Sequence, residues 1–199
     1  MKRIFFLGLV SIFLGGCVTT WTPVGEENVN YKSNSFSVSL PAGWMQWEAG
    51  RNKYTIRVNG VTKKIDAERV QVTNDGPQLQ YIDVIFLTKE NAFPSIQKAL
   101  TAGMLPSEIA DYEIADTKAR TGIEHLKVLK NIPASINGSD GFLLHLRYKN
   151  SGGLRIDEVI YGFGSDNGLY TLTYRAPVLH YFDKDYATFD SVVKSFRHS

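Results

Sequence analysis

Apolar and polar residues alternate over several short stretches of the chain, and this pattern predicts β-strands. In the segment 36–40, FSVSL, apolar residues alternate with serines, and PAGW at 41–44 predicts the turn that follows. The segment 79–88 is apolar almost throughout, so we expect it to be a central strand of a sheet. Two more short strands are predicted at 53–60 and 67–75.

The segment from Phe93 to Arg120 has helical spacing. Pro94 suits the first turn of a helix, and apolar residues follow at helical intervals, at positions 96, 99, 100 and 104. A second helix is predicted to start at Pro106, with Ile109, Tyr112 and Ala115 on one face. We therefore expect two helices here, or one helix that is broken between Gly103 and Pro106.

The remainder of the chain returns to strand patterns and ends in a helix. A strand at 126–137 is expected to be broken by Pro133, and the strand at 141–149 places alternate apolar residues on one face, namely Phe142, Leu144, Leu146 and Tyr148. SDNG at 165–168 predicts a hairpin turn between two strands. The segment 183–196 is an amphipathic helix whose apolar face holds Tyr186, Phe189, Val192, Val193 and Phe196.

The order of these elements predicts the fold class. Strands, helices, antiparallel strands and a final helix indicate an α+β fold, with a central, mostly antiparallel β-sheet sandwiched by helices. We divide the chain into residues 1–16, a polar stretch at 17–34 that contains Pro23 and Gly25, and a single domain at 35–199. The unpatterned polar stretch predicts a flexible tether.

Residues 1–16 are arranged like an export signal. Lys2 and Arg3 precede an uncharged apolar run from Ile4 to Leu14, which is too short for a helix that crosses a bilayer. LGGC at 14–17 resembles the bacterial lipoprotein lipobox, Leu-small-small-Cys. That resemblance implies that a signal peptidase cuts before Cys17, that the thiol carries a diacylglyceryl group and that the new amine is acylated, for example with palmitate.

The lone cysteine fits this resemblance better than the alternative of a free thiol. Cys17 is the one cysteine in the chain, so an intramolecular disulfide is excluded, and an exposed thiol in an oxidising compartment would be a liability. By the resemblance, the protein is a lipid-anchored cell-envelope protein. Val18 rather than Asp follows the cysteine, which favours the outer membrane, facing the periplasm, if the host is Gram-negative.

Charge excludes some classes of partner. Lys2 and Arg3 account for the formal net charge of +2, so the chain from residue 17 on is about neutral. Neutrality argues against a nucleic-acid partner and against a polybasic membrane patch. We expect the membrane to be reached through the lipid anchor, and we expect a protein partner in the envelope.

Two segments resemble the Mog1/PsbP-like domains. FSVSLPAGW at 36–44 resembles the opening strand and turn of that family, and the segment 169–196 resembles its closing strand, loop and last helix. The resemblance implies the same antiparallel sheet between helices. Members of the family mostly act by binding, and the resemblance carries no catalytic residues to this chain.

Residues that could carry chemistry do not form a catalytic or metal-ligating pattern. The histidines at 125, 145, 180 and 198 lack metal-ligand spacing, and His145 is expected to be a packed or surface histidine. Asp157 and Glu158 are adjacent on a strand and should point to opposite faces. Asp83 interrupts an apolar strand, and we expect it to face solvent or to hold a partner such as Arg147 or Arg155. We predict no catalytic residues, no metal and no cofactor.

Aromatic residues are the candidate binding residues. Trp and Tyr are enriched at protein interfaces and ligand grooves because they combine a large area with a polar tip. The candidates, which lie near predicted strand ends and the following loop, are Trp47, Tyr181, Trp44, Tyr161 and Tyr174. The alternative for Trp44 and Tyr174 is that they fill the core under the last helix.

Three functions follow from these observations. The first is a non-enzymatic envelope lipoprotein that binds another protein as an accessory or adaptor module. The second is a lipoprotein that binds a small ligand or glycan, for which a cavity between sheet and helices would be evidence. The third, an enzyme, needs a cluster of histidines or carboxylates that sequence spacing does not reveal.

Overall fold

A large antiparallel sheet forms the centre of the molecule. The computed structural model describes residues 21–27, 29–47 and 53–199, and among them the sheet has eight strands. In order across the sheet they are β1 (Trp21–Pro23), β4 (Met45–Trp47), β7 (Glu68–Thr73), β8 (Tyr81–Thr88), β12 (Gly168–Pro177), β11 (Arg155–Gly164), β10 (Ser139–Lys149) and β9 (Glu124–Ile136). Every neighbouring pair is antiparallel. The predicted central strand, β8, lies in the middle of the sheet.

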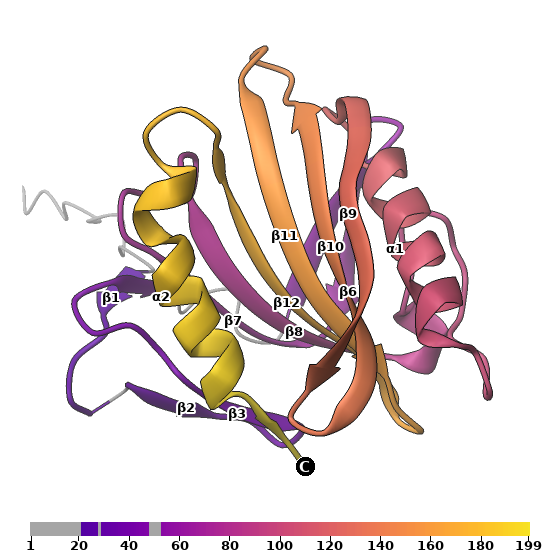
Figure 1. Ribbon diagram of the computed structural model, residues 1–199, viewed down its shortest axis with the longest axis horizontal. Helices are drawn as coiled ribbons and strands as arrows, with labels where there is room; N and C mark the ends of the chain where they lie inside the picture. Colours follow the sequence, from indigo (N-terminus) through magenta and orange to yellow (C-terminus); the bar gives the residue numbers. More distant parts are fainter. Residues whose placement is uncertain (1–20, 28, 48–52) are drawn as a thin grey trace, which may run out of the picture.

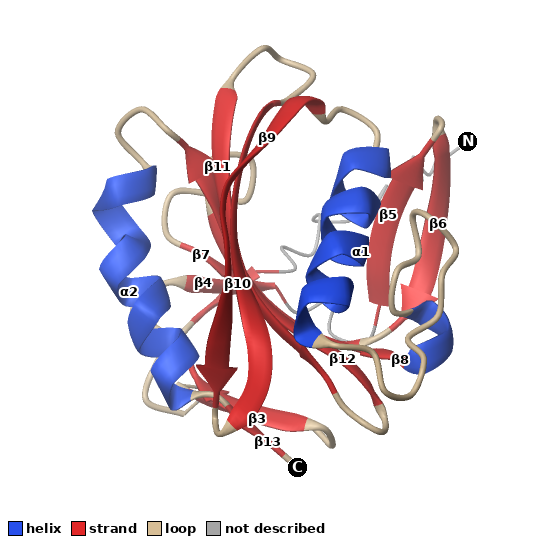
Figure 2. Cartoon of the chain, turned by 45° about the vertical axis from the view of Figure 1, so that its right-hand side comes forward, coloured by secondary structure: helices blue, strands red, loops and turns tan. Residues whose placement is uncertain are grey.

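Helices cover the two faces of this sheet. Figure 2 shows α2 (Phe182–Ser195) on one side and α1 (Pro106–Ala119) on the other, with the hairpin of β5 (Lys53–Val58) and β6 (Val61–Asp66) on the α1 side. A small sheet of β13 (Arg197–His198), β3 (Phe36–Ser39) and β2 (Asn30–Lys32) lies below α2 in Figure 1. A short 3₁₀ helix, η1 (Lys89–Asn91), follows β8. The predicted α+β sandwich is confirmed.

The core on the α2 side is rich in aromatic side chains. Helix α2 buries Phe189, Val192 and the following Phe196 against Tyr174 and other side chains of the sheet. The predicted amphipathic face of 183–196 is therefore confirmed for its central residues. The turn at PAGW is confirmed as well, because Gly43 has a φ of 80°, a left-handed value that suits glycine.

The prediction of a tether over 17–34 is wrong for the described residues within it. Trp21–Pro23 pairs with β4, Asn30–Lys32 pairs with β3, and Val24 is buried in the α2-side core. These strands pair through backbone hydrogen bonds, and three residues are too few to show a hydrophobic alternation in the sequence. The folded domain therefore includes residues from Trp21 on, whereas Cys17 and the predicted signal peptide lie outside the described residues.

The helix predicted to begin at Pro94 is also absent from the described structure. Residues 92–105 form turns closed by an antiparallel bridge between Phe93 and Lys98, and Gln97 has a left-handed φ of 56°. Ala92, Phe93 and Leu100 are buried next to α1, so the apolar residues fill the core without a helix. The one helix of this region starts at Pro106, as the second predicted start indicates.

Pro133 does not break its strand. β9 runs from Glu124 to Ile136, and Pro133 lies opposite Phe142 of β10. β9 is an edge strand, and an edge strand tolerates proline because one side of its backbone needs no hydrogen-bond partner. On β10, the predicted face holds Phe142, Leu144 and Leu146, which pack in the core on the α1 side.

Candidate functional site

A polar cavity of about 250 Å³ lies between the sheet and the elements on its α1 side. Its walls come from α1 and the residues that follow it, from β5, and from strands β7 to β10 across the sheet. Most of the lining residues carry charged or hydroxyl-bearing side chains. The polar residues among the lining are Tyr54, Thr55, Arg57, Arg69, Tyr81, Asp83, Glu113, Arg120, Thr121, Tyr148, Glu158, Thr171, Thr173 and Arg175. Buried titratable groups that converge on a cavity make this cavity the candidate functional site.

Helix α1 turns a polar face towards the sheet, and Glu113 on this face lines the cavity. The residues that it buries include Glu113, Asp116 and Thr117, which are spaced at helical intervals, and Arg120 follows one turn later. The predicted apolar face is only partly correct, because Ile109 is buried but Tyr112 is exposed. The helix thus packs on the sheet through an ionic network as well as through apolar contacts.

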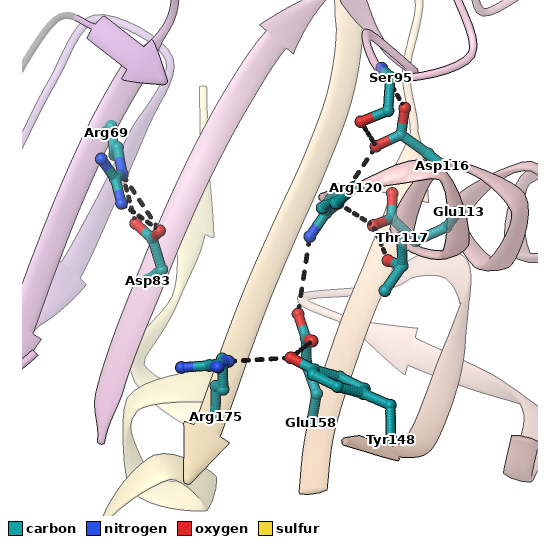
Figure 3. Close-up of polar contacts among 10 residues, drawn as sticks. All are labelled: Arg69, Asp83, Ser95, Glu113, Asp116, Thr117, Arg120, Tyr148, Glu158 and Arg175. Atoms are coloured by element: carbon teal, nitrogen blue, oxygen red, sulfur yellow. Dashed lines mark hydrogen bonds and ion pairs between the residues drawn. The ribbon is translucent and has the colours of Figure 1, made fainter. Parts of the chain in front are cut away.

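Arg69 and Asp83 form an ion pair at one end of the cavity. Nε of Arg69 donates to Oδ1 of Asp83 at 2.8 Å and Nη2 donates to Oδ2 at 2.6 Å, as Figure 3 shows. The guanidinium also lies 5.1 Å from the ring centre of Trp47 and 5.5 Å from that of Tyr54. Burial alone lowers the pKa of Arg69, but the charge of Asp83 outweighs it, and the pKa is raised above its usual value.

Arg120 is surrounded by three carboxylates. Nη2 lies 3.1 Å from Oε1 of Glu113 and 3.2 Å from Oδ2 of Asp116, while Nη1 lies 3.7 Å from Oε1 of Glu158. The Nε atom of Arg120 is buried and makes no hydrogen bond within the described chain. One guanidinium is therefore shared among more carboxylates than its charge can balance (Figure 3).

Glu113 responds to this surplus of acids. Burial raises its pKa to about 7, with further increases from Asp116 and Glu158 and an opposing effect of Arg120. A carboxyl group with such a pKa binds and releases a proton near neutral pH. The cavity thus contains one group that can change its charge under physiological conditions.

A third group joins Tyr148, Glu158 and Arg175. The Tyr148 hydroxyl donates to Oε2 of Glu158 at 2.7 Å and accepts from Nε of Arg175 at 2.8 Å. The Arg175 guanidinium also lies 5.7 Å from the ring centre of Tyr81 and 5.9 Å from that of Tyr148. Figure 3 shows this chain of contacts running from α1 across the sheet, from Arg120 through Glu158 and Tyr148 to Arg175.

The opposite face of the sheet holds the separate contacts of Asp157. Its carboxylate accepts from Nε and Nη2 of Arg147 and pairs with Nε2 of His145 at 2.9 Å. Glu158 lies on the cavity side, so the prediction that these two neighbours point to opposite faces is confirmed. His145 stacks on Phe182 and is a packed histidine, as expected. Asp83 pairs with Arg69, so the prediction of Arg147 or Arg155 as its partner is wrong.

The aromatic candidates from the sequence do not converge on one site. Trp44 and Tyr174 are buried in the core on the α2 side, which is the alternative stated for them, and Tyr161 packs against Phe189 there. Tyr181 is half-buried beside α2, and its carbonyl accepts a hydrogen bond from the Tyr174 hydroxyl at 2.8 Å. Trp47 alone lies near the cavity, where it stacks on Trp21 and contacts Arg69.

Sequence reasoning missed most of the cavity residues. One available signal was the polar stripe of Glu113, Asp116 and Thr117 on one face of the helix, with Arg120 directly after its end. A second was the alternation of Thr171, Thr173 and Arg175 along a strand. In the described part of the chain, no group of three or more His, Cys, Asp or Glu side chains could hold a metal ion.

Comparison with known proteins finds likeness in structure. No family model matches the chain, and no curated protein matches it. The solution structure of cyanobacterial PsbP (CyanoP) from Synechocystis is similar, with a TM-score of 0.52 and 13% identity over 96% of this chain and 100% of that one.

Two other solved structures superpose less well. The protein of unknown function PA94 from Pseudomonas aeruginosa has a TM-score of 0.46 and 11% identity over 72% of this chain and 95% of that one. LpqN, described as involved in cell envelope biogenesis of Mycobacterium tuberculosis, has a TM-score of 0.36 and 11% identity over 90% of this chain and 90% of that one. At such identity the likeness to CyanoP concerns the fold alone, and the chain has a PsbP-like fold.

Proposed function

We propose that the protein is a non-enzymatic accessory protein of the bacterial cell envelope that binds a small polar ligand in the α1-side cavity. The observation that carries this proposal is the cavity itself, about 250 Å³ in volume and lined by arginines and buried carboxylates between the sheet and α1. Ordinary cores exclude charge, because burying an ionised group is costly unless it serves pairing or binding. A small cavity of this chemistry suits a small, hydrogen-bonding ligand.

The envelope location in this proposal is supported by the sequence. LGGC at 14–17 and the charged, apolar segment before it resemble a lipoprotein signal, with Cys17 as the lipidated residue. Within the described residues, no helix is both long and apolar enough to span a bilayer. We propose that the protein is held at the outer membrane, facing the periplasm, if its host is Gram-negative.

A ligand screen with a blocked cavity tests the proposed function. The full chain, purified from membranes in detergent, is screened by thermal shift and titration calorimetry against neutral sugars, amines, amino acids, carboxylates and phosphate esters. Thr173, on the cavity wall, is changed to tyrosine to fill the space, and Thr62, exposed on β6, receives the same change as a control. We expect saturable binding that T173Y abolishes and T62Y preserves. If no compound of any charge binds in this way, the proposed function is wrong.

A second candidate function, docking of a protein, is favoured by the edge strand β9. Val128, Leu129 and Ile132 are 43%, 46% and 40% exposed on this strand, and Lys127 and Lys130 lie among them. An extended segment can add to such an edge through backbone hydrogen bonds. Because two copies of β9 would bring lysines together, the occupant that we propose is an acidic extended segment of another envelope protein.

Crosslinking in intact cells tests this second candidate. We expect crosslinks between β9 and an acidic segment of one partner, and their loss in L129E. Leu179, which is 70% exposed in the loop before α2, provides the control variant L179E. Crosslinks that map elsewhere, or that survive in L129E, would exclude docking at β9.

A further inference from the structure

Three of the arginines that line the cavity differ in how many of their donors are used. Arg69 gives Nε and Nη2 to Asp83, and Arg120 gives Nη2 to Glu113 and Asp116. Arg175 gives only Nε, to the Tyr148 hydroxyl. Within the described chain, its two terminal nitrogens make no hydrogen bond, although Arg175 is one of the residues that line the cavity.

The position of the Arg175 guanidinium is set by its surroundings. It lies over the rings of Tyr81 and Tyr148, and the hydroxyl that accepts from Nε is itself fixed by donating to Glu158. A guanidinium held at Nε presents its two Nη atoms as a planar fork, which matches the oxygens of a carboxylate or phosphate. Such prior ordering lowers the entropy that a ligand contact would otherwise cost.

The charge of Arg175 lacks a direct acidic partner. Glu158 is reached through the Tyr148 hydroxyl, and the other oxygen of Glu158 lies near Arg120. Asp83, the remaining carboxylate on the middle strands, is engaged by Arg69 at both oxygens. An acidic group from outside the chain would complete the coordination of Arg175.

Two threonines extend the same surface. Thr171 and Thr173 precede Arg175 at intervals of two on β12, so all three side chains point to the α1 side and line the cavity. The two hydroxyls make no side-chain hydrogen bond within the described chain, and each can donate to an oxygen. Together the row offers two hydroxyls and a fork of cationic donors.

We propose that Arg175, with Thr173 and Thr171 beside it, binds the acidic group of the ligand, a carboxylate or a phosphate. This proposal rests on the proposed function, because it names the ligand class of that same cavity. The cavity volume limits the occupant to a small acid or a sugar acid, and excludes a folded partner.

Sugars that share one ring and differ in their acidic group test the proposal. Glucose, glucuronate and glucose 6-phosphate are titrated into the full chain in detergent, and binding is measured by calorimetry. We expect glucuronate or glucose 6-phosphate to bind at least about tenfold more tightly than glucose, since a charge-assisted bidentate contact is worth that factor or more. The better of the two acids identifies the group as carboxylate or phosphate.

Variants at Arg175 connect the effect to this side chain. We expect R175Q to weaken binding of the preferred acid at least about tenfold, and R175K, which keeps the charge but loses the fork, to fall between R175Q and wild type. The control is R155Q, because Arg155 is exposed at the start of β11 and does not line the cavity. R175K also serves if R175Q fails to fold.

Several results would overturn the proposal. It is wrong if neither acid binds, if glucose binds as tightly as both acids, or if R175K binds the preferred acid as tightly as wild type. A neutral or cationic compound that binds and is blocked by T173Y would leave the proposed function standing while refuting the acidic ligand. Absence of any T173Y-sensitive binding in the wider screen counts against the proposed function itself.

Discussion

Arg69 and Asp83 form a doubly hydrogen-bonded ion pair diagonally across β7 and β8, with side chains that are 8% and 6% exposed. The strand register places Gln71 opposite Asp83 and Ile85 opposite Arg69. The long arginine side chain therefore reaches back along the sheet, as diagonal neighbours on one face can do. The charges of Arg69 and Asp83 balance each other at this end of the cavity. The unused donors therefore belong to Arg175.

Breaking this pair should strongly destabilise the fold. D83N leaves the buried charge of Arg69 without its partner, and removal of one member of a buried pair costs about 3 to 5 kcal/mol. The free energy of unfolding, measured by urea denaturation, is expected to fall by about 3 kcal/mol. The control is K194A, because Lys194 and Asp190 form an exposed pair whose loss should cost less than about 1 kcal/mol.

The double variant R69M/D83L gives the sharper comparison. It removes both charges, so we expect it to be more stable than D83N. Equal stability of D83N and wild type would contradict the view that this ion pair is buried and isolated from water.

Glu113 should make the stability of the protein fall as pH rises towards 7. Burial, together with the charges of Asp116 and Glu158, raises its pKa from an ordinary 4.5 to about 7, although Arg120 lowers it. Between these pH values the folded state binds more protons than the unfolded state, so the free energy of unfolding decreases with increasing pH. Tyr54 faces the same group from β5 and stays neutral in this range, since burial raises its pKa.

The difference between wild type and E113Q isolates this effect. The amide that E113Q introduces cannot ionise, so we expect the curve of E113Q against pH to lack the decline of about 2 to 3 kcal/mol between pH 4.5 and 7. Denaturation is measured across this range, with E124Q, at an exposed glutamate, as the control. Parallel curves for E113Q and wild type would show that Glu113 does not titrate there.

Asp116 should hold the segment 92–105 in place. Oδ1 accepts from the amides of Ser95 and Ile96 at 2.6 and 3.3 Å, and Oδ2 accepts from the Ser95 hydroxyl at 3.1 Å. D116A removes the acceptor of these donors, and each buried unsatisfied group costs about 1 to 3 kcal/mol. We expect hydrogen exchange of the Ser95 and Ile96 amides to accelerate by about tenfold or more.

A substitution on the exposed side of the same helix serves as the comparison. Asp111 is exposed, so D111A should leave exchange at Ser95 and Ile96 unchanged. Equal exchange in D116A and D111A would mean that other contacts hold this segment.

If Cys17 is lipidated, the β1 edge of the sheet must lie close to the membrane. Three residues separate Cys17 from Trp21, which limits the distance between their Cα atoms to about 14 Å. Trp21 and Trp47 stack on this edge with their ring centres 6.0 Å apart, whereas Trp44 is buried in the core. We expect lipids that carry a quencher near the headgroup to reduce the tryptophan fluorescence of the reconstituted protein.

Variants assign this quenching to particular residues. Removal of both edge tryptophans, W21F/W47F, should abolish most of it, and W44F should not. C17S, which lacks the anchor, should show no quenching in the presence of the same vesicles. Quenching that persists in W21F/W47F would place another part of the domain at the lipid.

Local patterns in the sequence predicted most strands, the last helix and the start of α1. Strand and helix periods depend on neighbours two to four positions apart, so they are visible in the printed chain. The same patterns gave a wrong prediction at 93–105, where apolar residues with helical spacing lie in turns and still fill the core. They were also wrong at Tyr112, because the buried face of α1 is polar. In both places, tertiary packing decided the outcome.

The sequence by itself determined the α+β class and the opposite orientation of Asp157 and Glu158. It left the role of Trp44 and Tyr174 open between binding and core packing. Only the tertiary structure decided the cavity. Arg69, Arg175 and Arg120 belong to β7, β12 and the end of α1, and the strand order places β8 between β7 and β12 although the two are far apart in sequence. Which side chains become partners, such as Arg69 and Asp83, depends on which strands become neighbours. Burial of the whole sheet brings those strands together, and local spacing in the sequence does not show this.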